Sequence, residues 1–345
     1  MKKIKFFMQH PRVTDLHTAL EYLRIESLMN DFLFIFDNKN PDYLIATEHI
    51  YFTEKWKQSF LEYESTPIKI FFGRELYMPD FNLFDYATSF YDKIECADRY
   101  VPLSSADDQY FDWLRCNEND IKTLTAAKEE FAKKQAFCNF LYSNGNAHHL
   151  RDECFYSLSQ YKKVESLGRW LNNVRKKGTG FEGHKLDSID IKHKYKFSIA
   201  FENAVCSGYT TEKIWTSLQA HTVPIYFGNP NISNIINPDC FINCNNLPLE
   251  EIKKIVIEID HDNDRWCKMV SSPWQTVLQL KDKEEQNQKY INFWKKIFSQ
   301  NLSDASRLAI GYHPDNYHKW FSSSKPIFYT NILRKIKNKI AAFIP

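Results

Sequence analysis

The chain has 345 residues, which is more than a single ordinary hydrophobic core holds, so two domains are expected. Aromatic residues make up 16% of it, whereas only 9 glycines are present, which disfavours glycine-rich phosphate loops. The net charge of +2 gives no general case for nucleic-acid binding, and no nucleic-acid partner is expected. The 8 cysteines lack the paired spacing of a zinc site and indicate reduced thiols.

The first third of the chain alternates short apolar runs with helical patterns. A helix is expected over Leu16–Leu23, and strands are expected over Ile4–Met8, Phe32–Phe36, Tyr43–Ala46 and Ile68–Phe72. Strands that alternate with helices predict an α/β fold with a mostly parallel sheet.

The segment Tyr195–Gly228 predicts a strand, a loop, a helix and a second strand. Apolar and small residues alternate in its first strand, and Thr210 is expected to cap the helix. Pro224 ends the helical geometry before the second strand. Because a crossover of this length joins parallel strands, the polar loop residues gather where a strand's carboxyl end faces a helix N-terminus. That arrangement favours nucleotides and phosphates.

The remaining chain adds a second α/β unit and a helical end. The polar stretch Ser104–Lys134 is expected to be the linker, and the second unit begins with the apolar run Ala136–Tyr142. Phe241–Cys244 predicts a strand and Leu249–Ile259 a helix, and the chain is helical after about residue 282.

The C-terminal segment, residues 321–345, has a short apolar stripe surrounded by lysine and arginine. A basic amphipathic helix of this kind binds anionic membrane surfaces, and peripheral membrane contact is one interpretation. A terminal helix packed on the N-terminal domain is the other, and the sequence leaves both open.

Three groups of residues resemble the α-1,3-fucosyltransferases, and in particular the bacterial members of glycosyltransferase family 10. The family signature is matched by Tyr195-Lys196-Phe197, Phe201-Glu202-Asn203, Tyr209-x-Thr211-Glu212-Lys213 and Val223-Pro224. Phe71–Asp92 and Asn139–Leu158 resemble two further family segments. The match weakens downstream, where Ile236 and Cys240 depart from the family pattern.

The resemblance implies an α/β fold of the GT-B type, with two Rossmann-like domains facing a central cleft and a C-terminal helical tail. Residues 1–125 would form the acceptor-binding domain, residues 126–320 the GDP-fucose-binding domain and residues 321–345 the basic tail. The implied activity is inverting transfer of L-fucose from GDP-β-L-fucose to a hydroxyl of N-acetylglucosamine or glucose in α-1,3 linkage. Lipopolysaccharide O-antigen or Lewis-type glycans are the implied products, and N-acetyllactosamine is a representative acceptor.

The resemblance also assigns roles to individual residues. Glu75 would be the base that takes the acceptor's proton, because a sugar hydroxyl is a weak nucleophile. Arg151 and Lys213 would neutralise the departing diphosphate. The further expected donor-binding residues are Glu202, Asn203, Tyr209, Glu212, Ser143 and Asn144. Asp80 and Asn82 are expected on the acceptor side.

No cofactor besides the donor substrate and no metal site is expected, because two cations can supply the electrostatics of the reaction. Asp260, Asp262 and Asp264 form an Asp-x-Asp pattern, but a solvated turn is the preferred interpretation. The basic N-terminal stretch lacks an apolar core of a signal peptide, so a cytoplasmic location is expected.

Two other functions remain open on the sequence. The same machinery could use another nucleotide sugar or make an α-1,4 linkage. A glycan-binding protein without catalysis is the other alternative.

Overall fold

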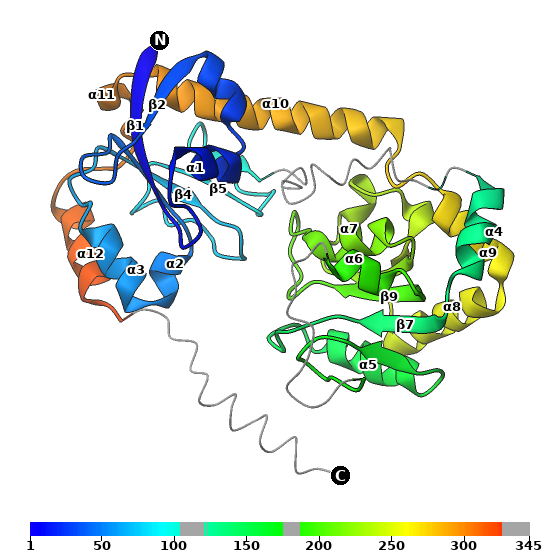
Figure 1. The fold of residues 1–345 in the computed structure, drawn as a ribbon. Coiled ribbons are helices and arrows are strands. Elements are labelled where there is room, and N and C mark those ends of the chain that lie inside the picture. The colour runs from blue at the N-terminus through cyan, green and yellow to red at the C-terminus, as the bar shows by residue number, and fades with distance from the viewer. Residues whose placement is uncertain (104–120, 122, 175–186, 326–345) are drawn as a thin grey trace. The chain divides into compact units, whose positions relative to one another are not determined.

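The computed structural model describes residues 1–103, 121, 123–174 and 187–325. The chain divides into two compact units, each built around its own sheet (Figure 1). The first unit contains Met1–Ser89, Ile94–Val101 and the described residues from Tyr290 onward, and the second contains Phe90–Lys93 and Pro102–Lys289. No described helix is both long enough and apolar enough to cross a membrane.

The first unit contains a six-stranded sheet in the order β2-β1-β3-β4-β5-β6. Its strands are β1 Lys2–Gln9, β2 Phe32–Phe36, β3 Tyr43–Ala46, β4 Ile68–Phe72, β5 Tyr86–Ser89 and β6 Tyr100–Pro102. The pairings of β1 with β2 and β3, of β3 with β4 and of β4 with β5 are parallel. The four strands expected from the sequence are present, three of them with the expected bounds.

Helices α1 (Leu16–Leu23), α2 (His49–Phe52) and α3 (Glu54–Leu61) connect the first strands. Helix α1 begins where the sequence provides a cap, because the Asp15 carboxylate accepts the backbone N–H of Thr18 while the Thr18 hydroxyl accepts that of Asp15. The short 3-10 helix over Glu26–Asn30 leads into β2.

The second unit contains a five-stranded parallel sheet in the order β11-β10-β9-β7-β8. Its strands are β7 Ala136–Phe140, β8 Val164–Ser166, β9 Tyr195–Phe201, β10 Val223–Phe227 and β11 Ile242–Asn243. Its helices are α4 Leu124–Ala132, α5 Leu150–Ser159, α6 Asp187–Lys192, α7 Glu212–Gln219, α8 Leu249–His261 and α9 Asn263–Ser271, with 3-10 turns over Ile232–Asn234 and Pro238–Cys240.

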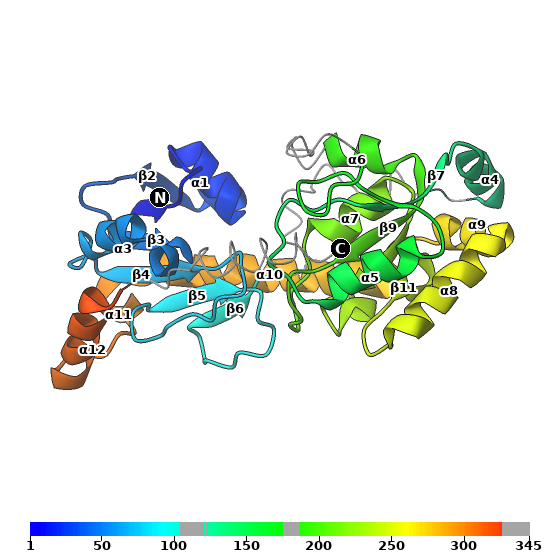
Figure 2. The same ribbon diagram turned by 90° about the horizontal axis from the view of Figure 1, so that it is seen from below.

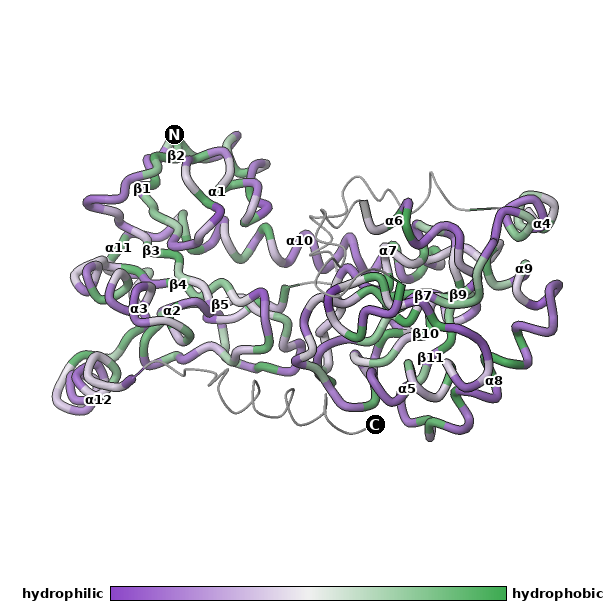
Figure 3. Tube along the Cα trace, turned by 60° about the horizontal axis from the view of Figure 1, so that its bottom comes forward, coloured by the Kyte–Doolittle hydropathy of each residue, from purple (hydrophilic) through white to green (hydrophobic). Residues whose placement is uncertain are grey.

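Helices cover both faces of this second sheet. Residues of α4, α5, α8 and α9 share one apolar cluster with the strands, and α7 with its neighbour α6 contributes to another. Figure 2 shows α8 and α9 side by side. In Figure 3 the tube is largely green around β9 and β10, whereas α8 mixes purple and green, as expected for a helix with one buried face.

The chain returns to the first unit at its C-terminal end. Helix α10 (Val277–Ser299) begins in the second unit and ends in the first, where α11 (Leu302–Ala305) and α12 (Tyr312–Ser323) follow. The ring of Phe298 contacts the rings of Phe32, Phe34 and Tyr43 edge-on at centroid distances of 5.9, 5.5 and 5.1 Å. This aromatic packing holds the end of α10 on the first sheet.

The division therefore differs from the expected boundaries, which placed residues 126–320 in one domain. The expected linker Ser104–Lys134 lies partly outside the described residues, and its last part is α4, which packs on α9 in the second unit. The stripe of the basic tail lies in residues 326–345, outside the described residues.

Phe298→Ala is expected to lower the free energy of unfolding by about 3–5 kcal/mol, because it leaves a cavity among buried aromatic rings. Urea denaturation of the full chain measures this change. Leu278→Ala on the same helix is the control, since Leu278 is 73% exposed, and should change the value by less than about 0.5 kcal/mol. Equal effects of the two substitutions would contradict the packing of Phe298 on the first sheet.

Candidate functional site

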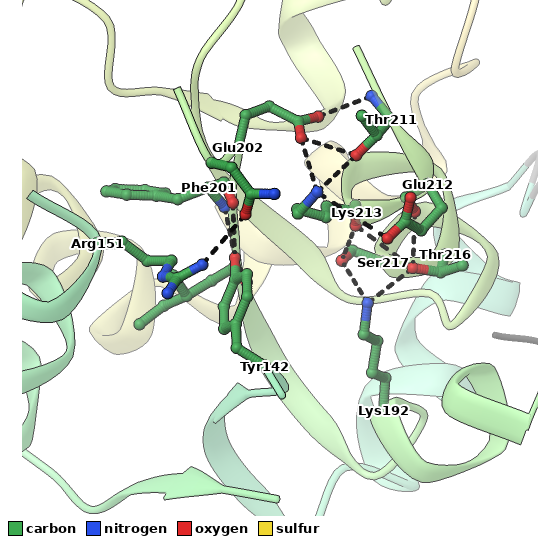
Figure 4. A network of polar contacts seen from close by, with 12 residues as sticks. Tyr142, Arg151, Lys192, Phe201, Glu202, Thr211, Glu212, Lys213, Thr216 and Ser217 are labelled. Carbon is green, nitrogen blue, oxygen red and sulfur yellow. Dashed lines mark hydrogen bonds and ion pairs between the residues drawn. The ribbon is translucent and has the colours of Figure 1, made fainter. Parts of the chain in front are cut away.

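The carboxyl end of β9 leads into a loop organised by the carboxylate of Glu202. Glu202 is fully buried and accepts hydrogen bonds from the backbone N–H of Thr211 at 2.7 Å and from its hydroxyl at 2.7 Å. The same carboxylate accepts a hydrogen bond from the Lys213 ammonium at 2.9 Å (Figure 4). A buried carboxylate needs such partners because desolvation of a charge is costly. Glu202 therefore fixes both the loop and the first turn of α7.

The expectation that Thr210 caps α7 is wrong. The N-cap is Thr211, and its side chain donates to Glu202 and makes no capping bond to the helix. The Thr210 hydroxyl instead accepts a hydrogen bond from the Asn229 amide at 3.0 Å. The positive end of the helix faces the Glu202 carboxylate, which supplies the negative charge that a helix N-terminus favours.

Lys213 lies in the first turn of α7 with 15% of its side chain exposed. Burial alone would lower its pKa, but the charges of Glu202 and Glu212 outweigh burial and raise the pKa well above the ordinary value. Its ammonium donates to Glu202 and to the Thr211 hydroxyl. An ammonium has three N–H donors, and these two bonds leave one for a further acceptor.

Two glycines allow the loop to close around these groups. Gly208 has φ +89, and a Cβ there would lie 2.0 Å from the carbonyl oxygen of Phe90. Gly228, which follows β10, has φ +152, and a Cβ there would lie 2.5 Å from the side chain of Glu202. Larger residues at either position would displace the loop.

Arg151, in the first turn of α5, lies at the neighbouring strand end. It is fully buried, and its guanidinium donates to the carbonyl oxygen of Asn144 at 2.7 Å and to the side-chain oxygen of Asn203 at 3.3 Å. Its Nε makes no hydrogen bond among the described residues but forms an ion pair with the Asp152 carboxylate at 3.6 Å. The guanidinium carbon lies 4.3 Å from the ring centroid of Tyr142, within cation–π distance.

Tyr142 is a site residue that the sequence did not indicate. Its hydroxyl accepts the N–H of Phe201 at 2.7 Å and lies 3.0 Å from the carbonyl oxygens of Ile199 and Phe201. Burial raises the pKa of Tyr142, and the charges of Arg151 and Lys213 act against that rise. Tyr142 therefore joins the end of β7 to the end of β9 and lies close to both proposed diphosphate cations (Figure 4).

Lys192, at the end of α6, is a second residue missed on the sequence. Its ammonium donates to the hydroxyls of Thr216 at 2.7 Å and Ser217 at 3.3 Å. These hydroxyls in turn donate to the carbonyl oxygens of Glu212 and Lys213. The sequence signal was weak, because one lysine at a helix end is common. The Lys192 amine therefore stabilises the first turn of α7 through the Thr216 and Ser217 hydroxyls.

The other expected donor residues divide into two groups. Asn203 contacts Arg151, and its carbonyl oxygen accepts the N–H of His148. Ser143 and Asn144 are exposed in the loop after β7. Tyr209 is buried, with its ring edge-on to that of Phe90 at a centroid distance of 5.1 Å, and Glu212 is the first residue of α7. The structure thus brings Arg151, Asn144 and Asn203 together, and Glu202 with Lys213.

The expected acceptor residues all belong to the first unit. Glu75 is exposed in the loop after β4. The Asp80 carboxylate accepts hydrogen bonds from the backbone and side chain of Asn82 and from the hydroxyl of Tyr317. These contacts attach α12 to the loop that contains Asp80 and Asn82.

The carboxylate of Asp260 is not part of a solvated turn, contrary to expectation. It is buried and accepts hydrogen bonds from Lys162, Lys196 and the hydroxyl of Tyr161. Among the described residues, one set of side chains has metal-ligand spacing: Glu130, His193 and His221. The Lys134 ammonium lies 2.8 Å from the Glu130 carboxylate, so a cation of the chain itself already neutralises that carboxylate.

Comparison with known proteins agrees with this geometry. Residues 130–307, more than half of the chain, match the sequence profile of glycosyltransferase family 10 (fucosyltransferase), C-terminal part. The chain therefore belongs to glycosyltransferase family 10.

Similar curated proteins include an α-(1,3)-fucosyltransferase of Helicobacter pylori, 28% identical over 220 residues, which are 54% of this chain and 42% of that protein. A GDP-fucose protein O-fucosyltransferase 3 of Xenopus tropicalis is 31% identical over 160 residues, which are 45% of this chain and 32% of that protein. The matched region is thus less than half the length of either relative.

A solved α1,3-fucosyltransferase has the same fold, with a TM-score of 0.68 over 90% of this chain and 93% of that one at 20% identity. The structure of an α1,3-fucosyltransferase with GDP-fucose gives a TM-score of 0.65, with 90% and 94% of the two chains covered at 20% identity. The expected α/β fold of GT-B type, with two Rossmann-like units, is confirmed.

Tyr142→Phe is expected to lower the free energy of unfolding by about 1–3 kcal/mol, because the N–H of Phe201 loses its buried partner. Urea denaturation measures the change, and Tyr156→Phe is the control because Tyr156 is 55% exposed. No difference between the two variants would show that the hydroxyl of Tyr142 does not hold β9.

Lys192 should make stability depend on pH. Burial lowers its pKa from 10.5 to about 7, so between these values the unfolded chain binds a proton that the folded chain does not. The destabilisation that the buried Lys192 causes in the folded protein therefore decreases as pH rises through this range. The stability of Lys192→Met minus that of the unsubstituted protein should fall by about 1.4 kcal/mol per pH unit there. Urea denaturation at several pH values tests this, with Lys281→Met as an exposed control. Parallel pH curves for Lys192→Met and the unsubstituted protein would contradict the assignment.

Proposed function

We propose that this protein transfers L-fucose from GDP-β-L-fucose to a saccharide hydroxyl with inversion at the anomeric carbon. The observation that carries the proposal is the pair of cations at the carboxyl edge of the second sheet. The Arg151 guanidinium has five N–H groups and makes two hydrogen bonds, while its Nε lies 3.6 Å from the Asp152 carboxylate. The Lys213 ammonium has one N–H beyond its two hydrogen bonds. Open parallel sheets bind nucleotides at this edge.

The chemistry needs those cations because the diphosphate gains negative charge as the bond to fucose breaks. The guanidinium of Arg151 can hold two phosphate oxygens at once, whereas Lys213 supplies a point charge at the start of α7. Glu202 keeps both Thr211 and Lys213 in place for this purpose. Asn203, which contacts Arg151, is proposed to donate its amide to the donor, and Tyr209 and Glu212 are proposed to complete the donor site.

Glu75 is proposed as the base. The acceptor hydroxyl oxygen attacks the anomeric carbon, its proton passes to the Glu75 carboxylate, and GDP departs with the electron pair of the broken bond. One displacement converts the β-linked donor to an α-linked product.

The finer assignment is an α-1,3 linkage to N-acetylglucosamine or glucose, in a lipopolysaccharide or Lewis-type glycan. The Helicobacter pylori α-(1,3)-fucosyltransferase, at 28% identity, supports this linkage. The same site with an α-1,4 linkage or another nucleotide sugar is the second candidate. A cytoplasmic location, with the basic tail on the membrane surface, is proposed on the sequence alone.

Incubation of the full chain with GDP-fucose and N-acetyllactosamine is expected to yield a fucosylated product, with the linkage read by NMR. Glu75→Gln should abolish transfer and keep GDP binding. Arg151→Lys should weaken GDP binding by about 10- to 100-fold in calorimetry, because a lysine cannot reproduce the two-pronged contact. Arg265→Lys in α9, where the half-exposed Arg265 side chain pairs with Glu258, is the matched control.

Absence of product together with absence of GDP binding would exclude the proposal. Product formed only with another nucleotide sugar, or in α-1,4 linkage, would establish the second candidate. Unchanged GDP affinity in Arg151→Lys would exclude Arg151 as a phosphate ligand.

A further inference from the structure

The carboxyl edge of the first sheet contains a second carboxylate near Glu75. Strands β3 and β4 are parallel, with Ala46 opposite Phe71, so the residues that follow them emerge at the same edge. Glu48 lies two residues beyond β3, and Glu75 lies three residues beyond β4. Glu48 was not indicated by the sequence, because it lies outside the family-like segments.

The side chain of Glu48 is directed to the Glu75 loop. Glu48 is 5% exposed and occupies the N-cap position of α2, yet it makes no capping bond there. Its Oε2 instead accepts the backbone N–H of Arg74 at 3.1 Å. The carboxylate thus holds the backbone immediately before Glu75.

The electrostatics of Glu48 reflect the same arrangement. Burial raises the pKa of Glu48 to about 7, and the charge of Glu75 adds to the rise. The backbone N–H groups of Glu48 itself and of Arg74, together with the charge of Arg74, oppose it. The guanidinium of Arg74 lies over the ring of Tyr22 at 4.8 Å.

The neighbouring imidazoles of this edge are not the counter-charge for Glu48. Burial, with the charge of His49, lowers the pKa of His10 to about 3, and burial also lowers the pKa of His49. The ring of His10 instead makes a hydrogen bond to the hydroxyl of Tyr22 at 3.0 Å. Glu48 and Glu75 therefore form an acidic pair, and Arg74, the residue before Glu75, is the cation beside Glu48.

We propose that Glu48 is a positioning residue that holds the Glu75 loop and whose negative charge strengthens Glu75 as a proton acceptor. The proposal rests on the proposed function of Glu75 as the base.

The physical basis is reciprocity between two like charges. If the charge of Glu75 disfavours ionisation of Glu48, an ionised Glu48 equally raises the proton affinity of Glu75. In the reaction the acceptor's proton passes to Glu75, the new C–O bond forms and GDP leaves with its electron pair. Glu48 neither accepts nor donates a proton in this step and acts only through Glu75.

The test is the pH dependence of kcat/KM for fucose transfer. In the unsubstituted protein the rate should rise as pH passes through about 7, where Glu48 ionises. Glu48→Gln keeps an oxygen for the N–H of Arg74 but carries no charge, so its rate should lack this rise and be lower by about 3- to 10-fold above pH 8. Glu48→Ala, which loses the bond to Arg74 as well, should be slower at every pH. Glu62→Gln, an exposed residue of the same unit, should behave like the unsubstituted protein.

A second readout does not depend on activity. Carbon-13 NMR can follow the carboxyl of Glu48, identified as the signal that Glu48→Gln removes, and Glu75→Gln should lower its pKa. An unchanged pKa of Glu48 in Glu75→Gln, or equal pH profiles for Glu48→Gln and the unsubstituted protein, would overturn the proposal. Complete loss of transfer in Glu48→Gln at all pH values would also overturn it, because Glu48 would then accept the proton itself. Absence of transfer by the unsubstituted protein would reject the proposed function, while the NMR result would still decide whether the two carboxylates are coupled.

Discussion

The buried carboxylate of Glu202 makes the contacts on which the carboxyl edge of the second sheet depends. An ionised group with no exposed surface is stable only when its oxygens are paired, and Thr211 and Lys213 supply that pairing here. The loop after β9, the start of α7 and the backbone at Gly228 all adopt conformations compatible with this carboxylate. A change in any of them would leave a charge buried without its partners.

Two cations near this edge are held in position by separate sets of contacts. Lys213 is paired inside the protein, and Arg151 lies between the ring of Tyr142 and the oxygens of Asn144 and Asn203. Each cation is thus fixed in position, with part of its donor capacity still available. Preorganised charge of this kind stabilises a developing anion without costly rearrangement during the reaction.

Much of the fold could be predicted from the sequence because apolar periodicity and helix caps are local signals. The bounds of α1, β2, β3 and β4 follow from such signals. The return of the chain to the first unit could not be predicted, because the partners of Phe298 are far away in the sequence. Motif spacing also supported the fold class, because it reflects the strand–loop–helix arrangement around the proposed donor site.

Several residues of the candidate site were named from the sequence, but the hydrogen bonds between them were only partly predicted. Glu202, Lys213 and Arg151 were named from motifs, yet the choice between Thr210 and Thr211 depends on which hydroxyl reaches Glu202 in three dimensions. Asp260 was expected in solvent because its neighbours in the sequence are charged, but Lys162 and Lys196 pair with it across the fold. Tyr142 carried no recognisable signal, since a tyrosine after a strand is usually part of a core.

A crystal structure of the protein with GDP would show whether Arg151 and Lys213 bind the diphosphate. We expect diphosphate oxygens within hydrogen-bond distance of the Arg151 guanidinium and the Lys213 ammonium, with Glu202 still bonded to Thr211. A diphosphate bound away from both cations would contradict this expectation.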